Sequence, residues 1–351
     1  MLRALRDEFR YILRNKEYLA LLTLLPMLSL LFFYLFFHNT AIEKLPIAVV
    51  DNDKSTTSAK VVEMINATAS VSVAYNALDV AESEQLIRSG RAYAAVIIPH
   101  DFERNILRRQ PCEVVLCNNG TNISTNGFIE KDIQTVIATF GAVVSLKTGQ
   151  SLAKILPINI EQHILFNSTL DYAAYLAPCF MPMMIMIFAI LGSIMATAER
   201  KRKGIKTLIG RVLPTTISMS IFALIMLIML FYLLGVPLKG SVWIILAATA
   251  LLIIDYQAIA ITLSLLTNNR HLAISLGGGY AVLAFTFSGL TFPTMTMAPI
   301  LRFLSHFFPF TYYMKIIVEQ GLRGAPAAIS LTSLGYMALF TLVPILIYKR
   351  L

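Results

Sequence analysis

The placement of the apolar runs constrains this chain more than any other feature of its sequence. About 20 apolar residues in a helix, rising about 1.5 Å each, cross the roughly 30 Å hydrocarbon core of a bilayer. Six such runs occur, at residues 18–37, 174–196, 212–235, 241–266, 272–292 and 330–348. The sequence therefore predicts an α-helical membrane protein with six transmembrane helices, one near the N-terminus and five in the C-terminal half.

Composition and charge agree with this prediction. The chain is 57% hydrophobic and only 14% charged, whereas soluble domains contain about 25% charged residues. A net charge of +9 could indicate nucleic-acid binding, but the basic residues lie mainly beside the apolar runs, as in the topology signal of membrane proteins. Both termini are therefore predicted to be cytoplasmic, with the lipid membrane as a partner and no nucleic acid.

The first apolar run could instead be the core of a secretory signal peptide. It is longer than such a core, and its flank lacks a small-residue cleavage site, so residues 18–37 are predicted to be transmembrane helix 1. Residues 1–17 are predicted to form a cytoplasmic amphipathic helix at the headgroups. Its apolar face consists of Leu2, Leu5, Phe9, Ile12 and Leu13. A plain charged lead-in to the anchor is the alternative.

Residues 38–173, between the first two runs, have the pattern of a mixed α/β domain. Short β-rich stretches such as Pro46–Val50 and Ala94–Ile98 alternate with helical stretches such as Ser58–Asn66. A long domain is translocated largely regardless of its charge. Because both termini are placed in the cytoplasm, this domain, inserted between helices 1 and 2, is predicted to be extracytoplasmic.

The segment between the fifth and sixth runs is too apolar for a solvated loop. Its helical stretches, interrupted by Pro299 and Pro309, are too short to cross a bilayer. Re-entrant or interfacial helices are the natural interpretation. The five-helix transmembrane domain is therefore predicted to cover residues 174–351, with a re-entrant outer segment at 294–324.

A search for catalytic signatures finds none in the sequence. It contains no HExxH, no GxSxG and no GxxxxGK[ST] phosphate-binding loop. Asp255 is the one acidic residue inside a predicted span, where a charge costs about 3 kcal/mol. One interpretation is that Asp255 has a functional role in a pathway or forms a hydrogen bond between helices. The other is that it is a structural residue, either protonated or locally paired. Gln257 and Asn268 are its possible partners. We expect no catalytic, metal or cofactor site on this chain.

Several segments of the chain together resemble one known family. In order, they are Leu45–Asp53, Tyr93–Phe102, Asn118–Asn122, Phe166–Asn167, Phe287–Pro293 and Pro299–Gly324. The order and spacing resemble the ABC type-2 transporter permeases that carry a large extracytoplasmic domain. One segment departs from the family pattern, because Gly204 is followed by Ile205 instead of threonine and Gly210–Pro214 arrives early. The cytoplasmic loop 197–211 is therefore shorter than usual. Because this loop is expected to contact the ATPase, the shortening affects the strength or geometry of the coupling.

The resemblance implies the permease subunit of an ATP-driven exporter in the cell inner membrane, moving a drug, lipid or similar substrate outward. It implies a second permease copy or paralogue, and a cytoplasmic ABC ATPase subunit that carries the ATP and Mg²⁺. It also allows a periplasmic adaptor. The residues expected to contact the ATPase are Arg6, Arg10, Glu199, Arg200, Lys201, Arg202, Lys203 and Gly204. The residues expected at the outer gate are Pro293, Pro299, Pro309, Tyr312, Tyr313 and Gly324.

Three other classes of protein are weaker interpretations. A non-transport envelope protein of the same layout, such as a secretion-system component or phage receptor, would lack the ATPase partner. A membrane-embedded enzyme would need converging titratable groups. A secondary transporter or channel would show more polar pathway residues and inverted repeats. The identity of the partner separates the first alternative from an exporter.

Overall fold

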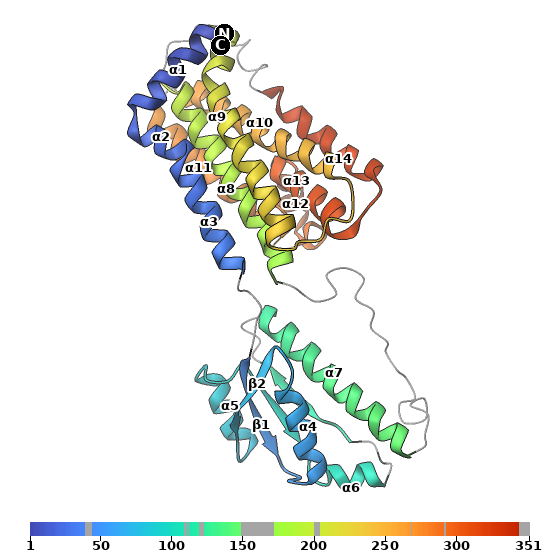
Figure 1. The fold of residues 1–351 in the computed structure, drawn as a ribbon. Coiled ribbons are helices and arrows are strands. Elements are labelled where there is room, and N and C mark those ends of the chain that lie inside the picture. The colour runs from blue at the N-terminus through green and yellow to red at the C-terminus, as the bar shows by residue number, and fades with distance from the viewer. Residues whose placement is uncertain are drawn as a thin grey trace. The chain divides into compact units, whose positions relative to one another are not determined.

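The computed structural model describes residues 1–38, 44–108, 110, 112–118, 123–148, 172–199, 204–267, 269–290 and 293–343. The chain divides into two compact units (Figure 1). One unit, called here the helical unit, combines residues 1–40 with 166–351, and the other, called the sheet unit, covers residues 41–165. The described part of the helical unit contains no strand, and the sheet unit contains a four-stranded sheet.

The sheet unit is built on a mixed sheet. Its strands are β1 (Leu45–Asp51), β2 (Val71–Asn76), β3 (Ala94–Ile98) and β4 (Val115–Asn118), in the order β2-β1-β3-β4. Strand β1 pairs in parallel with both β2 and β3, and β4 pairs antiparallel with β3. Residues 47–50 of β1 are all buried, as expected for a central strand covered on both faces.

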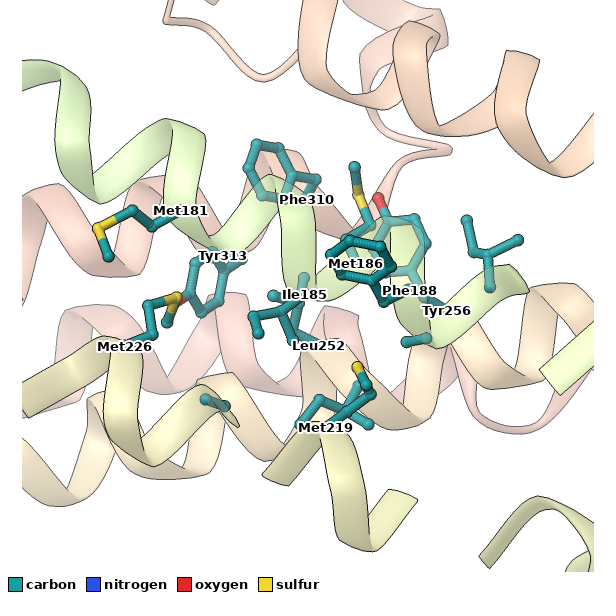
Figure 2. Close-up of a cluster of buried hydrophobic side chains, with 14 of the residues drawn as sticks. Met181, Ile185, Met186, Phe188, Met219, Met226, Leu252, Tyr256, Phe310 and Tyr313 are labelled. Carbon is teal, nitrogen blue, oxygen red and sulfur yellow. The ribbon is translucent and has the colours of Figure 1, made fainter. Parts of the chain in front are cut away.

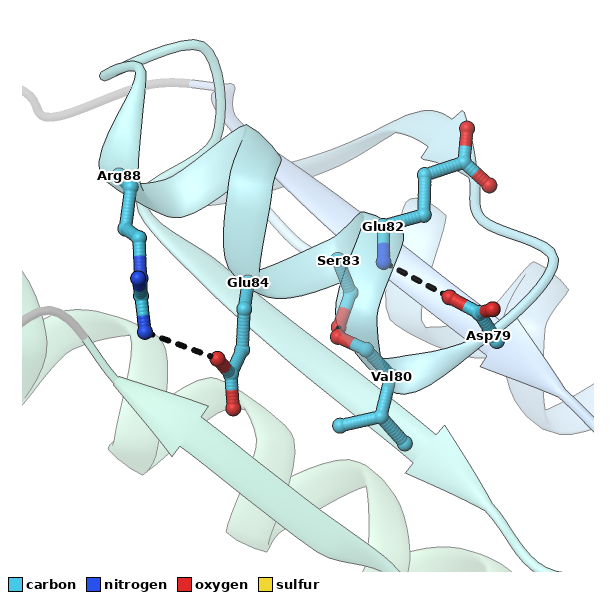
Figure 3. A network of polar contacts seen from close by, with 6 residues as sticks. All are labelled: Asp79, Val80, Glu82, Ser83, Glu84 and Arg88. Carbon is cyan, nitrogen blue, oxygen red and sulfur yellow. Dashed lines mark hydrogen bonds and ion pairs between the residues drawn. The ribbon is translucent and has the colours of Figure 1, made fainter.

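Helices cover both faces of this sheet. They are α4 (Thr56–Asn66), α5 (Val80–Arg88), α6 (Phe102–Leu107) and α7 (Ile123–Thr148). Helices α4 and α7 pack on one face through residues such as Ile65 and Ile133, and α5 packs on the other through Leu86. Figure 3 shows the start of α5, where the Asp79 carboxylate accepts a hydrogen bond from the Glu82 backbone N–H at 2.7 Å. Such a side-chain cap satisfies one of the free N–H groups of the first turn.

The helical unit contains ten α-helices in its described residues. They are α1 (Leu2–Arg14), α2 (Lys16–Leu22), α3 (Leu24–His38), α8 (Tyr172–Thr197), α9 (Ile205–Ile228), α10 (Val242–Thr267), α11 (Arg270–Thr286), α12 (Pro299–Ser305), α13 (Pro309–Ile317) and α14 (Ala327–Phe340). Short π-helical turns follow α9 (Met229–Leu233) and α13 (Val318–Arg323).

Four helical segments of the described residues are long and apolar enough to cross a membrane. They are Lys16–His38, Ala173–Thr197, Ile205–Leu233 and Val242–Thr267. They correspond to the first four predicted runs. The fifth run was predicted over 272–292, but α11 ends at Thr286 after 17 residues. Of the sixth run, α14 covers up to Phe340, and residues 344–348 lie outside the described part.

The first spanning segment is interrupted, which the prediction of one helix over 18–37 missed. Helix α2 ends at Leu22 and α3 begins at Leu24. Pro26 has no N–H to donate to the carbonyl of Leu22, four residues earlier. The hydroxyl of Ser218 in α9 donates a hydrogen bond to that carbonyl instead. The interruption therefore has a local cause and is compensated by a neighbouring helix.

Helix α9 begins earlier than predicted. The run was placed at 212–235, but the helix starts at Ile205, directly after Gly204, whose φ of 85° turns the chain. Lys206 and Arg211 lower the hydropathy of residues 205–211, so the sequence suggested a loop there. The connection between α8 and α9 is therefore limited to residues 198–204, which corrects the predicted loop of 197–211.

The core of the helical unit includes part of the predicted outer segment. Figure 2 shows Phe310 and Tyr313 of α13 among Met181 of α8, Met226 of α9 and Leu252 of α10, all of them fully buried. Helix α13 is thus not a peripheral loop but an element held inside the bundle. That residues 294–324 form a re-entrant outer segment stays a prediction.

Candidate functional site

The N-terminal helix is held close to the start of α9. Gly210 of α9 faces α1, and a Cβ atom added there would lie 2.8 Å from the carbonyl oxygen of Met1 and 3.1 Å from the Cβ of Ala4. The two helices can therefore approach this closely only because residue 210 has no side chain. Helix α1 and the first turns of α9 form one packed surface.

A buried tyrosine connects this surface to the spanning helices. Tyr18 of α2 is 0% exposed. Its hydroxyl donates a hydrogen bond to the carbonyl of Gly192 in α8 at 3.0 Å and lies 3.3 Å from Oγ1 of Thr215 in α9. Three helices thus meet at one polar point inside an apolar core, where a buried hydroxyl needs such partners.

Several of the residues predicted to contact an ATPase lie at this end of the helical unit. Arg6 and Arg10 are exposed on α1. Glu199 accepts a hydrogen bond from the backbone N–H of Arg270 at 2.9 Å, which joins the end of α8 to the start of α11. Gly204 begins α9. The remaining predicted contacts, Arg200, Lys201, Arg202 and Lys203, lie outside the described residues.

Most of the apolar face predicted for α1 is not covered by the rest of the helical unit. Of its five apolar residues, Ile12 is buried, whereas Leu2 and Leu13 are 76% and 69% exposed. Glu8 is buried at 2% instead. The helix therefore packs on α9 through a stripe next to the predicted face. The exposed leucines leave apolar surface on its outer side, which is compatible with a bilayer interface.

The prolines predicted at the outer gate begin helices. Pro299 and Pro309 occupy the first positions of α12 and α13, where the missing N–H has no intrahelical partner to lose. Pro293 precedes a single 3₁₀ turn, Thr294–Thr296. Arg302 of α12 donates through Nε to the carbonyl of Thr294 at 3.1 Å. The segment before α13 is thus folded back on itself.

The two tyrosines of α13 have different surroundings. Tyr313 is 0% exposed, and its hydroxyl lies 3.4 Å from Oγ1 of Thr249 in α10. Tyr312 donates to the carbonyl of His306 at 3.3 Å and stacks on Tyr336 of α14, with ring centroids 5.2 Å apart. Of these two predicted gate residues, Tyr313 is a core residue and Tyr312 is partly exposed.

A buried polar cluster, called here the latch, follows α13. It consists of Glu319, Gln320 and Ser330. The Gln320 side chain is fully buried and accepts from the backbone N–H of Ser241 at 2.9 Å. Its amide nitrogen donates to Ser330 Oγ at 2.9 Å and to the carbonyl of Ala325 at 3.1 Å. The Ser330 hydroxyl donates to the Glu319 carboxylate at 2.7 Å.

Backbone contacts extend the latch. The N–H of Gly240 donates to the carbonyl of Gln320 at 2.7 Å, and the N–H of Lys239 donates to that of Gly321 at 3.1 Å. Gly324 has a φ of 66°, and a Cβ there would lie 3.0 Å from the Cβ of Lys239. The connection between α9 and α10 is thus fixed to the turn between α13 and α14. Gly324, predicted at a gate, supplies both the turn and the close approach.

Comparison with known proteins identifies the family. The family model described as ABC-2 family transporter protein matches residues 16–348. The chain belongs to this family. The ABC-2 family assignment confirms the resemblance drawn from the sequence, and with the apolar spanning helices it makes this chain an integral membrane protein.

Curated relatives of this ABC-2 chain carry a transport name. It is 22% identical over 255 residues to the probable multidrug ABC transporter permease YbhS of Escherichia coli strain K12, and equally to the protein of the same name from E. coli O157:H7. The match covers 68% of this chain and 66% of the length of each relative, so the chain spans just under two thirds of them. No solved structure matches the chain.

Asp255 is buried inside α10 of this ABC-2 chain. It is 0% exposed, and within the described residues neither carboxylate oxygen has a hydrogen-bond partner. Gln257, predicted as one partner, accepts from Thr216 Oγ1 at 3.0 Å instead, because residues two apart on a helix do not face each other. The other predicted partner, Asn268, lies outside the described part. A functional role for Asp255 stays a prediction.

Asp51 and Asp53, at the end of β1, both accept hydrogen bonds through their carboxylates. Ser58 donates to Asp51 at 2.7 Å, and the backbone N–H of Glu103 donates to Asp53 at 3.0 Å. Burial acts to raise the pKa of Asp53, but hydrogen bonds from Ser55 and from the backbone at residues 102 and 103 outweigh it, and the pKa is lowered from 3.8. The described residues contain no group of three or more His, Cys, Asp or Glu that could hold a metal ion.

Replacing Asp53 with asparagine is expected to flatten the loss of stability of the sheet unit in acid. A folded-state pKa below the unfolded value stabilises the protein above the unfolded pKa, and this stability is lost as the pH falls through the folded-state pKa. Denaturation of the full chain, followed at pH values from neutrality to below 3.8, should show a smaller pH dependence in Asp53→Asn. Identical profiles for the two proteins would contradict the assignment.

The sequence did not reveal the latch or the Tyr18 contact. Glu319 and Gln320 lie in the predicted re-entrant outer segment, and Ser330 begins the next predicted span. Their hydrogen-bond partners are distant backbone groups and one another, which a sequence pattern does not show. Tyr18 stood at the edge of an apolar run. The usable signal was the polar pair at 319–320 next to a predicted helix in an otherwise apolar segment.

Proposed function

We propose that this chain is the membrane permease subunit of an ATP-driven ABC exporter. The family match over residues 16–348 is the observation that carries the proposal. The proposed cargo is a drug, lipid or similar molecule moved outward, and the name of the E. coli relatives, a probable multidrug ABC transporter permease, supports drugs as a cargo. The sequence contains no phosphate-binding loop, so the energy is assigned to a separate ATPase subunit that carries ATP and Mg²⁺, and the permease itself is no enzyme.

The proposed topology has six spans in the cell inner membrane. Helices α11 and α14 serve as the fifth and sixth spans, both termini are cytoplasmic, and residues 38–173 are extracytoplasmic. The functional unit contains a second permease copy or paralogue, and the extracytoplasmic domain offers a surface to a periplasmic adaptor. The distribution of lysine and arginine supports this orientation.

The ATPase is proposed to act on the end of the helical unit where α1 packs against α9. Arg6 and Arg10 of α1, with residues 199–204, form the contact. Movement of α1 and α2 would reach α8 and α9 through Tyr18, whose hydroxyl touches both helices. The outer gate around α13 would open in response. The ATPase would drive this opening if it binds the open state of the helix bundle more tightly than the closed state.

Reversing the charge of the α8–α9 connection tests the proposal. The full chain, tagged and extracted in mild detergent, is expected to co-purify with an ATPase that carries a phosphate-binding loop. In Lys201→Glu with Arg202→Glu the recovered ATPase should fall at least about tenfold, because like charges facing each other cost several kcal/mol.

A matched control uses two reversals in the sheet unit, Lys60→Glu with Arg108→Glu, at exposed positions. This control should retain the ATPase. Unchanged recovery in the Lys201 and Arg202 variant would show that the coupling assignment is wrong. Recovery of an envelope partner without any ATPase from the unaltered chain would favour a non-transport envelope protein and overturn the proposed function.

A further inference from the structure

A buried carboxyl group without a partner lies near the middle of α10. Asp255 is 0% exposed, and neither of its oxygens accepts a hydrogen bond in the described part of the chain. No basic side chain of the described residues compensates its charge. Exchanging the two carboxylate oxygens changes nothing, because both are acceptors. The helical unit therefore encloses a group whose ionised form is costly until a positive charge or hydrogen-bond donors meet it.

Aromatic rings from three elements lie near this carboxyl group. Asp255 interacts electrostatically with the phenols of Tyr256, on the same helix, and of Tyr280 in α11. The ring centroids of Tyr256 and Tyr280 are 6.1 Å apart, and those of Tyr280 and Phe308 are 5.1 Å apart. Phe308 directly precedes α13. A carboxylate beside several aromatic faces has the chemistry that recognises organic cations, because both the charge and the rings attract a positive head.

The hydroxyl of Tyr280 fastens these rings together. It donates a hydrogen bond to the carbonyl of Phe307 at 2.7 Å, which joins α11 to the turn before α13. Tyr280 is partly exposed and Phe307 is 53% exposed, so this contact lies at the surface of the helical unit. It can therefore open without unpacking the buried core.

We propose that Asp255 is the counter-ion of a monovalent organic cation, a quaternary ammonium or a protonated amine. The rings of Tyr256, Tyr280 and Phe308 hold the charged head. Tyr280 closes the site through its bond to Phe307, and the ligand enters when this bond opens. The inference rests on the proposed function, for which it names the substrate class. Binding itself requires neither ATP nor an ATPase, so the two proposals can fail separately.

Benzyltrimethylammonium is a suitable probe because its charge is permanent and the neutral neopentylbenzene has the same shape. The full chain in phosphatidylcholine nanodiscs, without ATPase, should bind the tritiated cation saturably. Unlabelled benzyltrimethylammonium should compete at least about tenfold better than neopentylbenzene, because only the cation compensates the carboxylate and attracts the rings electrostatically. This comparison needs no variant. Equal competition by the two compounds would overturn the proposal.

Replacing Asp255 with asparagine tests the counter-ion. Asp255→Asn keeps the size of the side chain and removes the charge, so binding of the cation should fall at least about tenfold. Thermal unfolding in the same nanodiscs checks that the variant is folded. The control is Glu84→Gln in the sheet unit, where the exposed Glu84 pairs with Arg88 at 3.3 Å, and it should bind normally. Equal binding in the two variants would show that Asp255 does not hold the cation.

Replacing Tyr280 with phenylalanine tests the closure. Tyr280→Phe keeps the ring and removes the bond to the Phe307 carbonyl, so the affinity should rise about fivefold, the equivalent of one net hydrogen bond, as the open state becomes more populated. The matched control is Tyr175→Phe in α8, because the Tyr175 hydroxyl donates to the Leu290 carbonyl at 2.9 Å. This control should bind normally. Equal affinities in the two variants would show that Tyr280 does not close the site.

The outcomes distinguish this site from the proposed function. Cation binding that is lost in Asp255→Asn supports the site even when no ATPase co-purifies with the unaltered chain. Cation binding that survives in Asp255→Asn overturns the site even when the ATPase is present.

Discussion

Replacing Gln320 with alanine is expected to lower the folding free energy of the helical unit by on the order of 3 kcal/mol. The buried amide of Gln320 satisfies three groups, the N–H of Ser241, the carbonyl of Ala325 and the hydroxyl of Ser330. Alanine leaves the two backbone groups without their partner and opens a space in the core. Denaturation of the detergent-purified full chain, compared with the unaltered protein, measures the change.

A second variant reaches the same latch from the opposite side. A Cβ atom at Gly240 would lie 2.8 Å from the carbonyl oxygen of Gln320 and would overlap its side-chain oxygen, so Gly240→Ala should also destabilise the protein. Gly335 of α14 has no atom within 4 Å of an added Cβ, and Gly335→Ala should be neutral or stabilising by up to about 1 kcal/mol. Similar stabilities for Gly240→Ala and Gly335→Ala would refute the latch.

The latch also limits how an outer gate could open. It fixes the α9–α10 connection to the turn between α13 and α14 through hydrogen bonds that are buried or partly buried. Movement of α13 alone would expose or orphan several polar groups, whereas movement of both segments together would preserve them. A gate in this region is therefore expected to move as one body that includes the latch.

Hydropathy predicted the spanning helices well where their ends are apolar. The runs at 174–196 and 241–266 agree with α8 and α10 to within a few residues. Hydropathy failed where apolar residues continue beyond the end of a helix. Residues 287–292 remain apolar after α11 has ended at Thr286, and Gly289 follows with a φ of 88°, a turn that an average over a window cannot show.

The candidate sites were only partly accessible to sequence reasoning. Resemblance to a family selected the segment around α13, because prolines and tyrosines mark it. Gln320 and Tyr18 act through contacts with residues far away in the chain, which no local pattern encodes. Asp255 was noticed because a carboxylate in a span is conspicuous, but the prediction of Gln257 as its partner was wrong since the two residues point to different sides of α10.

Replacing Gly192 with alanine is expected to destabilise the helical unit by about 2–3 kcal/mol, the upper part of the range of about 1–3 kcal/mol for overpacking a tight core. An added Cβ would lie 2.8 Å from Cγ2 of Thr215 and 2.9 Å from Cδ2 of Leu22. Helix α8 would have to move away from α2 and α9, and the hydrogen bond from Tyr18 to the Gly192 carbonyl would lengthen.

The proper control for Gly192→Ala is the same substitution at Gly278 of α11, where an added Cβ meets no atom within 4 Å. Gly278→Ala should be neutral or slightly stabilising, as expected for Gly335→Ala, and should leave ATPase recovery unchanged. If the junction of α2, α8 and α9 transmits the action of the ATPase, Gly192→Ala should retain the ATPase in co-purification yet lose transport at temperatures where the protein is still folded. Normal transport in a folded Gly192→Ala protein would show that this junction stabilises the bundle without coupling it to the ATPase.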